Sequence, residues 1–221
     1  MADIAFLLLI FFLVTTTVEI DSGISKTLPI QLENPPPSPI ITERDVLRLS
    51  VNLNDELMVD DVRTSINELE EALNHFYLDN ANGLDNNPNM PLYKPVSGSN
   101  CVSKIGELES ALSREPNNRY VQHELKKWRT KLKLCNAFGG QYMEISKSSI
   151  IRFECSNKTS FGFYIAVQNT LKKTVNKLRS EKCEEMGWPS YFELDAAKPS
   201  DQEKINMLRI MIPERILEAK I

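Results

Sequence analysis

The apolar run near the N-terminus constrains the fold of this chain more than any other feature. From Ile4 to Val18 the only polar residues are the three threonines Thr15 to Thr17, whereas the sequence after the run has the mixture of an ordinary soluble protein. A membrane-spanning helix needs about 20 predominantly apolar residues to cross roughly 30 Å of hydrocarbon, and this run supplies about fifteen. We predict a transmembrane helix over residues 1–20.

The predicted span is short, and no Lys or Arg precedes it to fix its orientation. A cleaved signal peptide would explain a short apolar run, but it requires a basic N-terminal region and a cleavage site with small residues, and neither is present. Both the short span and the missing basic flank are explained if the natural chain begins about 15 to 30 residues before Met1. We therefore expect a truncated start.

Asp3 is an acidic residue at the beginning of this apolar run. An ionised carboxylate inside a membrane is costly, so a residue of this kind usually faces a helix bundle, a water-filled cavity or a proton path. The alternative is a carboxylate at the membrane surface that has no function. Asp3 is the first candidate functional residue.

A proline-rich linker is predicted over residues 21–44, before a folded domain at 45–221. Its prolines favour an extended polyproline II conformation of about 3.1 Å per residue and oppose helix and sheet pairing; they are Pro35, Pro36, Pro37 and Pro39. We interpret the segment as a stiff spacer, the alternative being a proline-rich recognition motif for another module.

The folded domain begins with a strand pattern. Apolar and polar residues alternate from Val46, which places four apolar side chains on one face: Leu47, Leu49, Val51 and Leu53. Asn54-Asp55 is typical of a hairpin turn, so residues 56–59 are predicted to return as the partner strand. Asp61 is the predicted N-cap of a helix over residues 62–78.

The last third of the chain contains similar patterns. We predict a strand over residues 148–155, a helix that begins at Ser160, an amphipathic segment over 202–212 and a short final strand or edge segment over 215–219. Together these elements predict an α+β fold, in which two helices cover one face of a small mixed sheet.

An additional helical hairpin is predicted between these two parts, inserted at about 98–137. Residues 80–95 are rich in Asn and Pro and are interpreted as a loop. Helical periodicity follows over residues 102–113 and 120–134, and a turn over 114–117 separates the two stretches.

The predicted hairpin brings two of the four cysteines together. Cys101 precedes its first helix and Cys135 follows its second. An oxidising compartment favours a disulfide between them, which would contribute about 3 to 4 kcal/mol in the chain-entropy model, and the alternative is two free thiols. We do not expect Cys155 to pair with Cys183, because the helix between them separates its ends by roughly 30 Å.

Three segments resemble the ExbD/TolR family of biopolymer transport proteins. They are residues 3–17 (DIAFLLLIFFLVTTT), residues 160–178 with their YIAVQN core, and residues 212–219 (IPERILEA). The resemblance covers roughly residues 1–80 and 145–221, and the sequence departs from the family between them. The basic tail that precedes the acidic residue in this family is also missing.

The resemblance implies that Asp3 is the proton-carrying residue of a subunit that transduces the proton motive force. It implies a complex of the ExbB-ExbD-TonB type that energises outer-membrane import, with an ExbB-like multi-span subunit and a TonB-like protein as partners, and self-association as a dimer. The implied location is the inner membrane, with the C-terminal domain in the periplasm. The alternative is a membrane-anchored TolR-like module that binds peptidoglycan or a periplasmic partner.

The composition argues against other classes of function. With 26 Lys and Arg against 30 Asp and Glu, the chain has no basic surface for nucleic acid. We expect no metal site and no cofactor, since only His75 and His123 offer imidazole ligands and no Cys-x-x-Cys pair occurs. We expect no enzyme, because nucleophile and phosphate-loop motifs are missing and the acidic pairs Glu70-Glu71 and Glu184-Glu185 fit solvated helix faces.

Overall fold

The computed structural model describes residues 6–7 and 41–220. Residues 6–7 are helical, and within the described parts of the chain no helix is both long and apolar enough to cross a membrane. Apart from residues 6–7, the predicted transmembrane helix over residues 1–20 lies outside the described residues, and so does the predicted linker up to residue 40. The chain divides into two compact units, residues 1–34 and 35–221, and the architecture below is that of the second.

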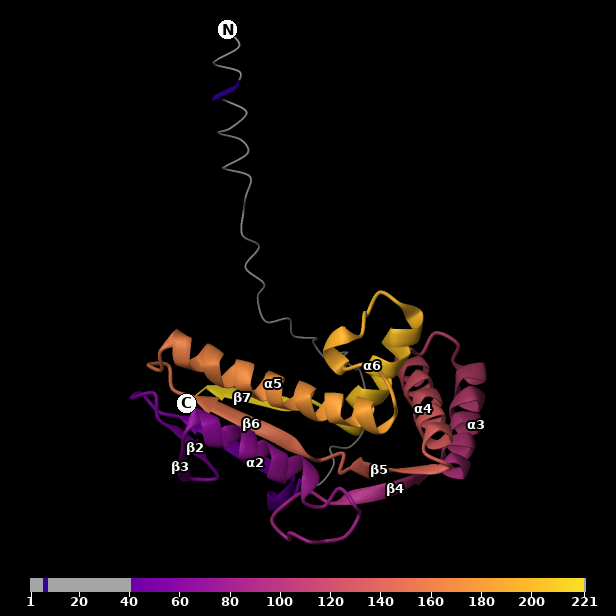
Figure 1. Ribbon diagram of the computed structural model, residues 1–221. Coiled ribbons are helices and arrows are strands. Elements are labelled where there is room, and N and C mark those ends of the chain that lie inside the picture. The colour runs from indigo at the N-terminus through magenta and orange to yellow at the C-terminus, as the bar shows by residue number, and fades with distance from the viewer. Residues whose placement is uncertain (1–5, 8–40, 221) are drawn as a thin grey trace. The chain divides into compact units, whose positions relative to one another are not determined.

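A mixed five-stranded sheet organises this unit (Figure 1). Its strands are β1 Val46–Val51, β2 Leu57–Val59, β3 Val62–Thr64, β6 Ile150–Cys155 and β7 Ile216–Lys220. They lie in the order β3-β2-β1-β6-β7, in which the β1-β2 and β2-β3 pairs are antiparallel and the β1-β6 and β6-β7 pairs are parallel. With five helices in the described region, the fold belongs to the α+β class that the sequence predicts.

Two helices, α2 (Ile66–Leu78) and α5 (Phe161–Glu185), lie side by side over one face of the sheet (Figure 1). Successive strand residues point to opposite faces, so the apolar side chains of β1 and β6 gather under these helices. Leu49 and Phe153 are buried there, whereas the neighbouring Arg152 is exposed. The main hydrophobic core lies between the sheet and the two helices.

The start of α2 differs from the prediction. Asp61 is not its N-cap, because it has a φ of 67° and lies in the turn between β2 and β3. Ser65 caps the helix instead: its hydroxyl accepts a hydrogen bond from the backbone N–H of Glu68, and the Glu68 carboxylate accepts one from the backbone N–H of Ser65. This reciprocal capping box sets the helix start, and Val62 belongs to a short strand.

The predicted position of Leu53 on the buried face is also wrong. The strand ends at Val51, and Leu53 is 59% exposed in the following turn. The side-chain oxygen of Asn52 accepts hydrogen bonds from the backbone N–H groups of Asn54 and Glu56, and this local bonding turns the chain early. The antiparallel return strand is present as β2.

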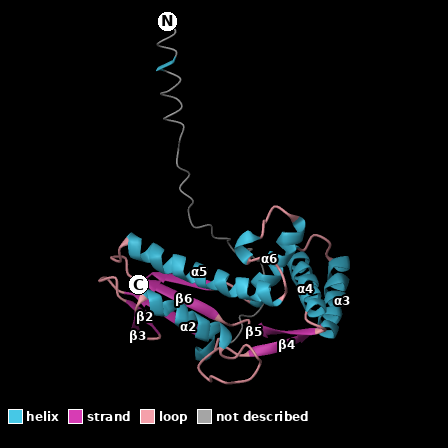
Figure 2. Ribbon diagram, viewed as in Figure 1, coloured by secondary structure: helices cyan, strands magenta, loops and turns pink. Residues whose placement is uncertain are grey.

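A second group of elements contains a two-stranded ribbon and a helical hairpin (Figure 2). The antiparallel strands β4 (Tyr93–Ser97) and β5 (Gln141–Ile145) form the ribbon, and α3 (Gly98–Arg114) and α4 (Arg119–Ala137) form the hairpin between them. The helix α6 (Pro199–Met211) packs against α4 and β5.

The prediction of a loop over residues 80–95 is wrong at its end, because β4 begins at Tyr93 and pairs with the unpredicted strand β5. Pro95 lies inside β4, opposite Met143. A proline lacks the N–H donor of a strand and is tolerated where one edge of the strand is unpaired, as in this two-stranded ribbon.

The C-terminal elements begin close to their predicted positions. Ser160 is the N-cap of α5, since its hydroxyl accepts a hydrogen bond from the backbone N–H of Phe163. The final strand β7 pairs with β6 at the edge of the sheet. Two short 3₁₀ turns complete the description, at Glu43–Asp45 and Tyr191–Glu193.

Candidate functional site

The predicted proton-carrying residue, Asp3, lies outside the described residues. Residues 41–45, here called the linker junction, contain the described end of the predicted linker and lead directly into β1. The hydroxyl of Thr42 donates a hydrogen bond of 2.9 Å to the carboxylate of Asp45, which is 6% exposed. The chain is thus fixed just before it enters the sheet.

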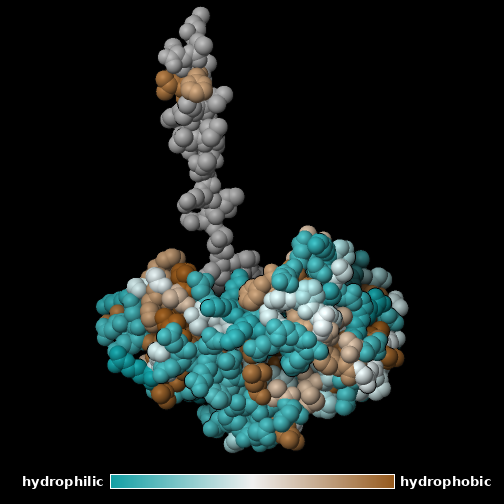
Figure 3. All heavy atoms as spheres, in the orientation of Figure 1, coloured by the Kyte–Doolittle hydropathy of each residue, from teal (hydrophilic) through white to brown (hydrophobic). Residues whose placement is uncertain are grey.

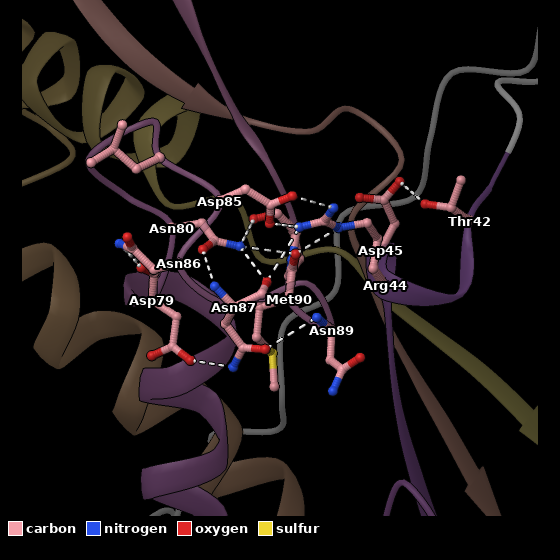
Figure 4. Close-up of polar contacts among 12 residues, drawn as sticks. Thr42, Arg44, Asp45, Asp79, Asn80, Asp85, Asn86, Asn87, Asn89 and Met90 are labelled. Carbon is pink, nitrogen blue, oxygen red and sulfur yellow. Dashed lines mark hydrogen bonds and ion pairs between the residues drawn. The ribbon is translucent and has the colours of Figure 1, made fainter.

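Arg44 connects the linker junction to the loop that follows α2 (Figure 4). Its guanidinium donates two hydrogen bonds to the carboxylate of Asp85, of 2.6 Å from Nη2 and 3.2 Å from Nη1. It also donates to the backbone carbonyls of Met90, at 2.9 Å, and Asn87, at 3.3 Å. A two-pronged contact between guanidinium and carboxylate fixes orientation as well as distance.

Asn80 holds the same loop from the inside (Figure 4). It is 1% exposed, and its side-chain NH₂ donates to the backbone carbonyls of Asn87 at 2.9 Å, Met90 at 3.1 Å and Pro91 at 3.2 Å. Its side-chain oxygen accepts a hydrogen bond from the backbone N–H of Asn87, whose own side chain donates to Asp79 at 2.7 Å. The loop therefore follows a fixed path without regular secondary structure.

The charges of this network favour the ionised carboxylates. The hydrogen bond from Arg44 holds the pKa of Asp85 below its ordinary value of 3.8. Burial raises the pKa of Asp79, but hydrogen bonds with His75 and Asn87 outweigh that effect and leave its pKa lowered. Both carboxylates stay charged under mildly acidic conditions.

Sequence reasoning did not identify this junction. Asn and Asp side chains readily bond to nearby backbone groups, so the Asn-rich composition of residues 79–89 was a signal of an internally bonded loop. Nothing in the sequence marked Arg44 as its partner, because 41 residues separate Arg44 from Asp85. They meet only in the folded domain, where residues 41–45 lie against the loop that follows α2.

Cys101 and Cys135, the predicted disulfide pair, lie close together at the end of the α3-α4 hairpin that joins the ribbon. Cys101 lies in the first turn of α3 and Cys135 in the last turn of α4. Both are fully buried as thiols, and their sulfur atoms are 3.8 Å apart. The Cys135 thiol also donates to the backbone carbonyl of Val96 in β4, at 3.3 Å.

A buried ion pair accompanies these thiols. Lys131 of α4 donates two hydrogen bonds to the carboxylate of Glu144 in β5, at 2.6 and 2.8 Å, and the two residues are 1% and 7% exposed. Burial lowers the pKa of Lys131, and the carboxylate of Glu144 opposes that shift. The ammonium also lies 4.6 Å from the ring centre of Trp128. We call Cys101, Cys135, Lys131 and Glu144 the hairpin base.

A cavity of about 260 Å³ opens between the two groups of elements, with largely apolar walls. Two of the tyrosine hydroxyls that line it are engaged elsewhere, since Tyr77 donates to the carbonyl of Pro213 and Tyr93 to the carbonyl of Tyr77. In the described residues no group of three or more His, Cys, Asp or Glu side chains is placed to hold a metal ion. The visible surface is mainly hydrophilic, with apolar residues in separate patches (Figure 3).

Comparison with known proteins gives one result. Residues 1–92 match the model of the family described as biopolymer transport protein ExbD/TolR. No curated protein and no solved structure matches the chain. The matched stretch contains Asp3, the linker, the linker junction and the loop that Arg44 binds, and it ends just before β4. Over residues 1–92 the chain is therefore similar to the ExbD/TolR family of biopolymer transport proteins.

Proposed function

We propose that this chain is the ExbD-like, proton-motive-force transducing subunit of an inner-membrane complex of the ExbB-ExbD-TonB type, which energises outer-membrane import. The family supports the general role, because its members are transport components of TonB/Tol-type energy-transducing systems and not enzymes. It also implies partners of the ExbB/TolQ and TonB/TolA types and an anchor in the inner membrane.

In this proposal Asp3 carries the proton. Its carboxylate alternates between protonated and ionised forms inside an ExbB-like multi-span subunit, which supplies the polar groups that an intramembrane charge needs. Transfer of one charge across about 100 mV releases roughly 2.3 kcal/mol, and a pH gradient adds to this. That energy is enough to bias a motion of the membrane segment relative to its partner.

The linker junction receives this motion. A displacement transmitted along the linker over residues 21–44 reaches β1 directly and reaches the loop after α2 through Arg44. The observation that carries the proposal is the continuous family match from Asp3 to this loop, which contains each part of the route. The described domain, placed in the periplasm, passes the motion to a TonB-like protein, and the chain acts as a dimer.

A TolR-like module that binds peptidoglycan or a periplasmic partner is the second candidate. The matching family joins ExbD and TolR in one description, so the match supports this function as well. In that case Asp3 would be incidental, and binding by the periplasmic domain would be the main activity.

Energised uptake by an Asp3→Asn variant of the full-length gene tests the proposal. Asn keeps the size of the side chain and cannot carry the charge, so we expect energised uptake and the growth that depends on it to be lost. Membrane insertion and protein level are measured in parallel, and Asp21→Asn, outside the apolar run, is the matched control. Normal uptake by a correctly inserted Asp3→Asn protein would exclude the proton-carrying role and favour the anchored binding module.

A further inference from the structure

We propose that Cys101 and Cys135 form a disulfide that closes the base of the α3-α4 hairpin. The proposal rests on the proposed function in one respect, since it places the domain in the oxidising periplasm, where disulfides form and persist. It concerns a part of the chain that lies beyond the family match.

The geometry brings the two residues within reach of each other. Their sulfurs are 3.8 Å apart, and a disulfide requires about 2.05 Å, so an approach of roughly 1.8 Å completes the bond. The chain segments are already held together at this point, because the backbone N–H of Gly98 donates to the carbonyl of Gly140 at 2.9 Å. The two sulfurs face each other from the first turn of α3 and the last turn of α4.

The reaction requires a thiol-disulfide oxidase of the cell envelope. The thiolate of one cysteine of this chain attacks the disulfide of the oxidase and forms a mixed disulfide. The second cysteine of the chain then attacks the sulfur of the first, and the oxidase leaves as a dithiol. Two thiols lose two protons and two electrons in total, and the oxidase takes up the electrons. The products are one protein disulfide and one reduced enzyme.

Burial determines when this step takes place. In the folded domain burial and the neighbouring Cys135 raise the pKa of Cys101 to about 12, so the reactive thiolate is scarce. Both sulfurs are also inaccessible to another protein, because the two residues are 0% exposed. The disulfide therefore forms during folding and afterwards resists reduction, which makes it a structural bond and not a redox switch.

The bond stabilises the attachment of the hairpin to the ribbon. Cys101 follows β4 closely and Cys135 precedes β5, so the disulfide joins the two helices where they leave the strands. Closing a loop of this length restricts the unfolded chain, and for a domain of this size we expect the midpoint of thermal unfolding to rise by about 10 °C.

Thiol trapping of the full-length protein in cell envelopes tests the proposal. The protein is quenched in acid and alkylated with N-ethylmaleimide while denatured and unreduced, and its tryptic peptides are weighed. We expect the peptides that contain Cys101 and Cys135 to be joined until a reductant is added, with Cys155 and Cys183 alkylated. Alkylation of all four cysteines in a domain shown to be periplasmic would overturn the disulfide.

Two further measurements separate the test of the disulfide from the test of the proposed function. Protease access to the domain in spheroplasts shows separately whether the domain lies in the periplasm. If the domain is cytoplasmic, the proposed function fails. Refolding of the purified protein in a glutathione redox buffer then decides whether Cys101 and Cys135 form the disulfide. Reduction of the wild-type protein should lower its unfolding midpoint to that of a Cys101→Ala/Cys135→Ala variant. An unchanged midpoint after verified reduction would show that the bond has no structural effect.

Discussion

The linker junction and the hairpin base are both held by a cation paired with a carboxylate, but they differ in their access to water. The side chains of Arg44 and Asp85 are 21% and 51% exposed, whereas those of Lys131 and Glu144 are 1% and 8% exposed. An exposed ion pair contributes little to stability, and a buried pair is costly to leave incomplete. The hairpin base thus affects whether the domain folds, and the junction affects how the linker is connected to it.

The largest effect is expected from Lys131→Met. The change removes the buried ammonium and leaves the carboxylate of Glu144 without its partner, so unfolding by denaturant should show a loss of about 3 to 5 kcal/mol. The double variant Lys131→Met/Glu144→Leu should recover most of this loss, since two apolar side chains replace the pair. A single variant as stable as the wild type would contradict the buried ion pair.

A smaller loss is expected from Asn80→Ala. The change removes the side-chain donor to the carbonyls of Asn87, Met90 and Pro91 in a site that excludes water. Arg44 still donates to the carbonyls of Asn87 and Met90, so the change leaves the carbonyl of Pro91 without its side-chain donor and the backbone N–H of Asn87 without its acceptor. Such unpaired buried groups cost about 1 to 3 kcal/mol, which equilibrium unfolding can measure. Asn89→Ala, at an exposed position of the same loop, is the control and should change little. Equal stability of the two variants would argue against the bonding described for Asn80.

Arg44→Gln should leave the free energy of global unfolding nearly unchanged, because the pair with Asp85 is exposed. The loop should nevertheless open more often, and hydrogen exchange should be faster at the backbone N–H of Met90, which bonds to the carbonyl of Asn87. A loss as large as that of Asn80→Ala would mean that the junction contributes to the core of the domain, and the contrast with the hairpin base would disappear.

The smallest effect is a local response to acid. The folded-state pKa of Asp85 is lowered below 3.8, so its contribution is present above that pH and is lost as the pH falls through the lowered pKa. Hydrogen exchange in the loop should therefore become relatively faster below about pH 4 in the wild type. Asp85→Asn should reduce this pH dependence and leave the part that comes from the lowered pKa of Asp79, which accepts a hydrogen bond from Asn87 of the same loop. A variant with the full wild-type dependence would assign the response to groups other than Asp85.

Periodic patterns predicted most of the regular elements. The alternation from Val46 and the helical stripes of α3, α4 and α5 correspond to observed elements, because burial on one face imposes these periods directly on the sequence. The prediction failed where local hydrogen bonds outweigh periodicity. Ser65 and Asn52 redirect the backbone over two or three residues, and such short signals are easily hidden by neighbouring apolar residues.

The candidate site was less predictable than the fold. The meeting of Cys101 and Cys135 follows from the ends of an antiparallel hairpin, so their spacing was informative. The pairings of Arg44 with Asp85 and of Lys131 with Glu144 join different elements, and periodicity in one segment contains no information about a partner in another. The position of Lys131 on an apolar helix face is only a weak indication of a buried ion pair, since a long side chain there usually reaches solvent.

Energised uptake by a full-length Arg44→Gln protein tests most directly whether motion enters the domain at the linker junction. The control is Arg63→Gln, which removes an exposed ion pair with Glu56 elsewhere on the domain. At equal protein levels and equal domain stability, the account predicts reduced uptake for Arg44→Gln and normal uptake for Arg63→Gln. Uptake by Arg44→Gln equal to that of the control would contradict it.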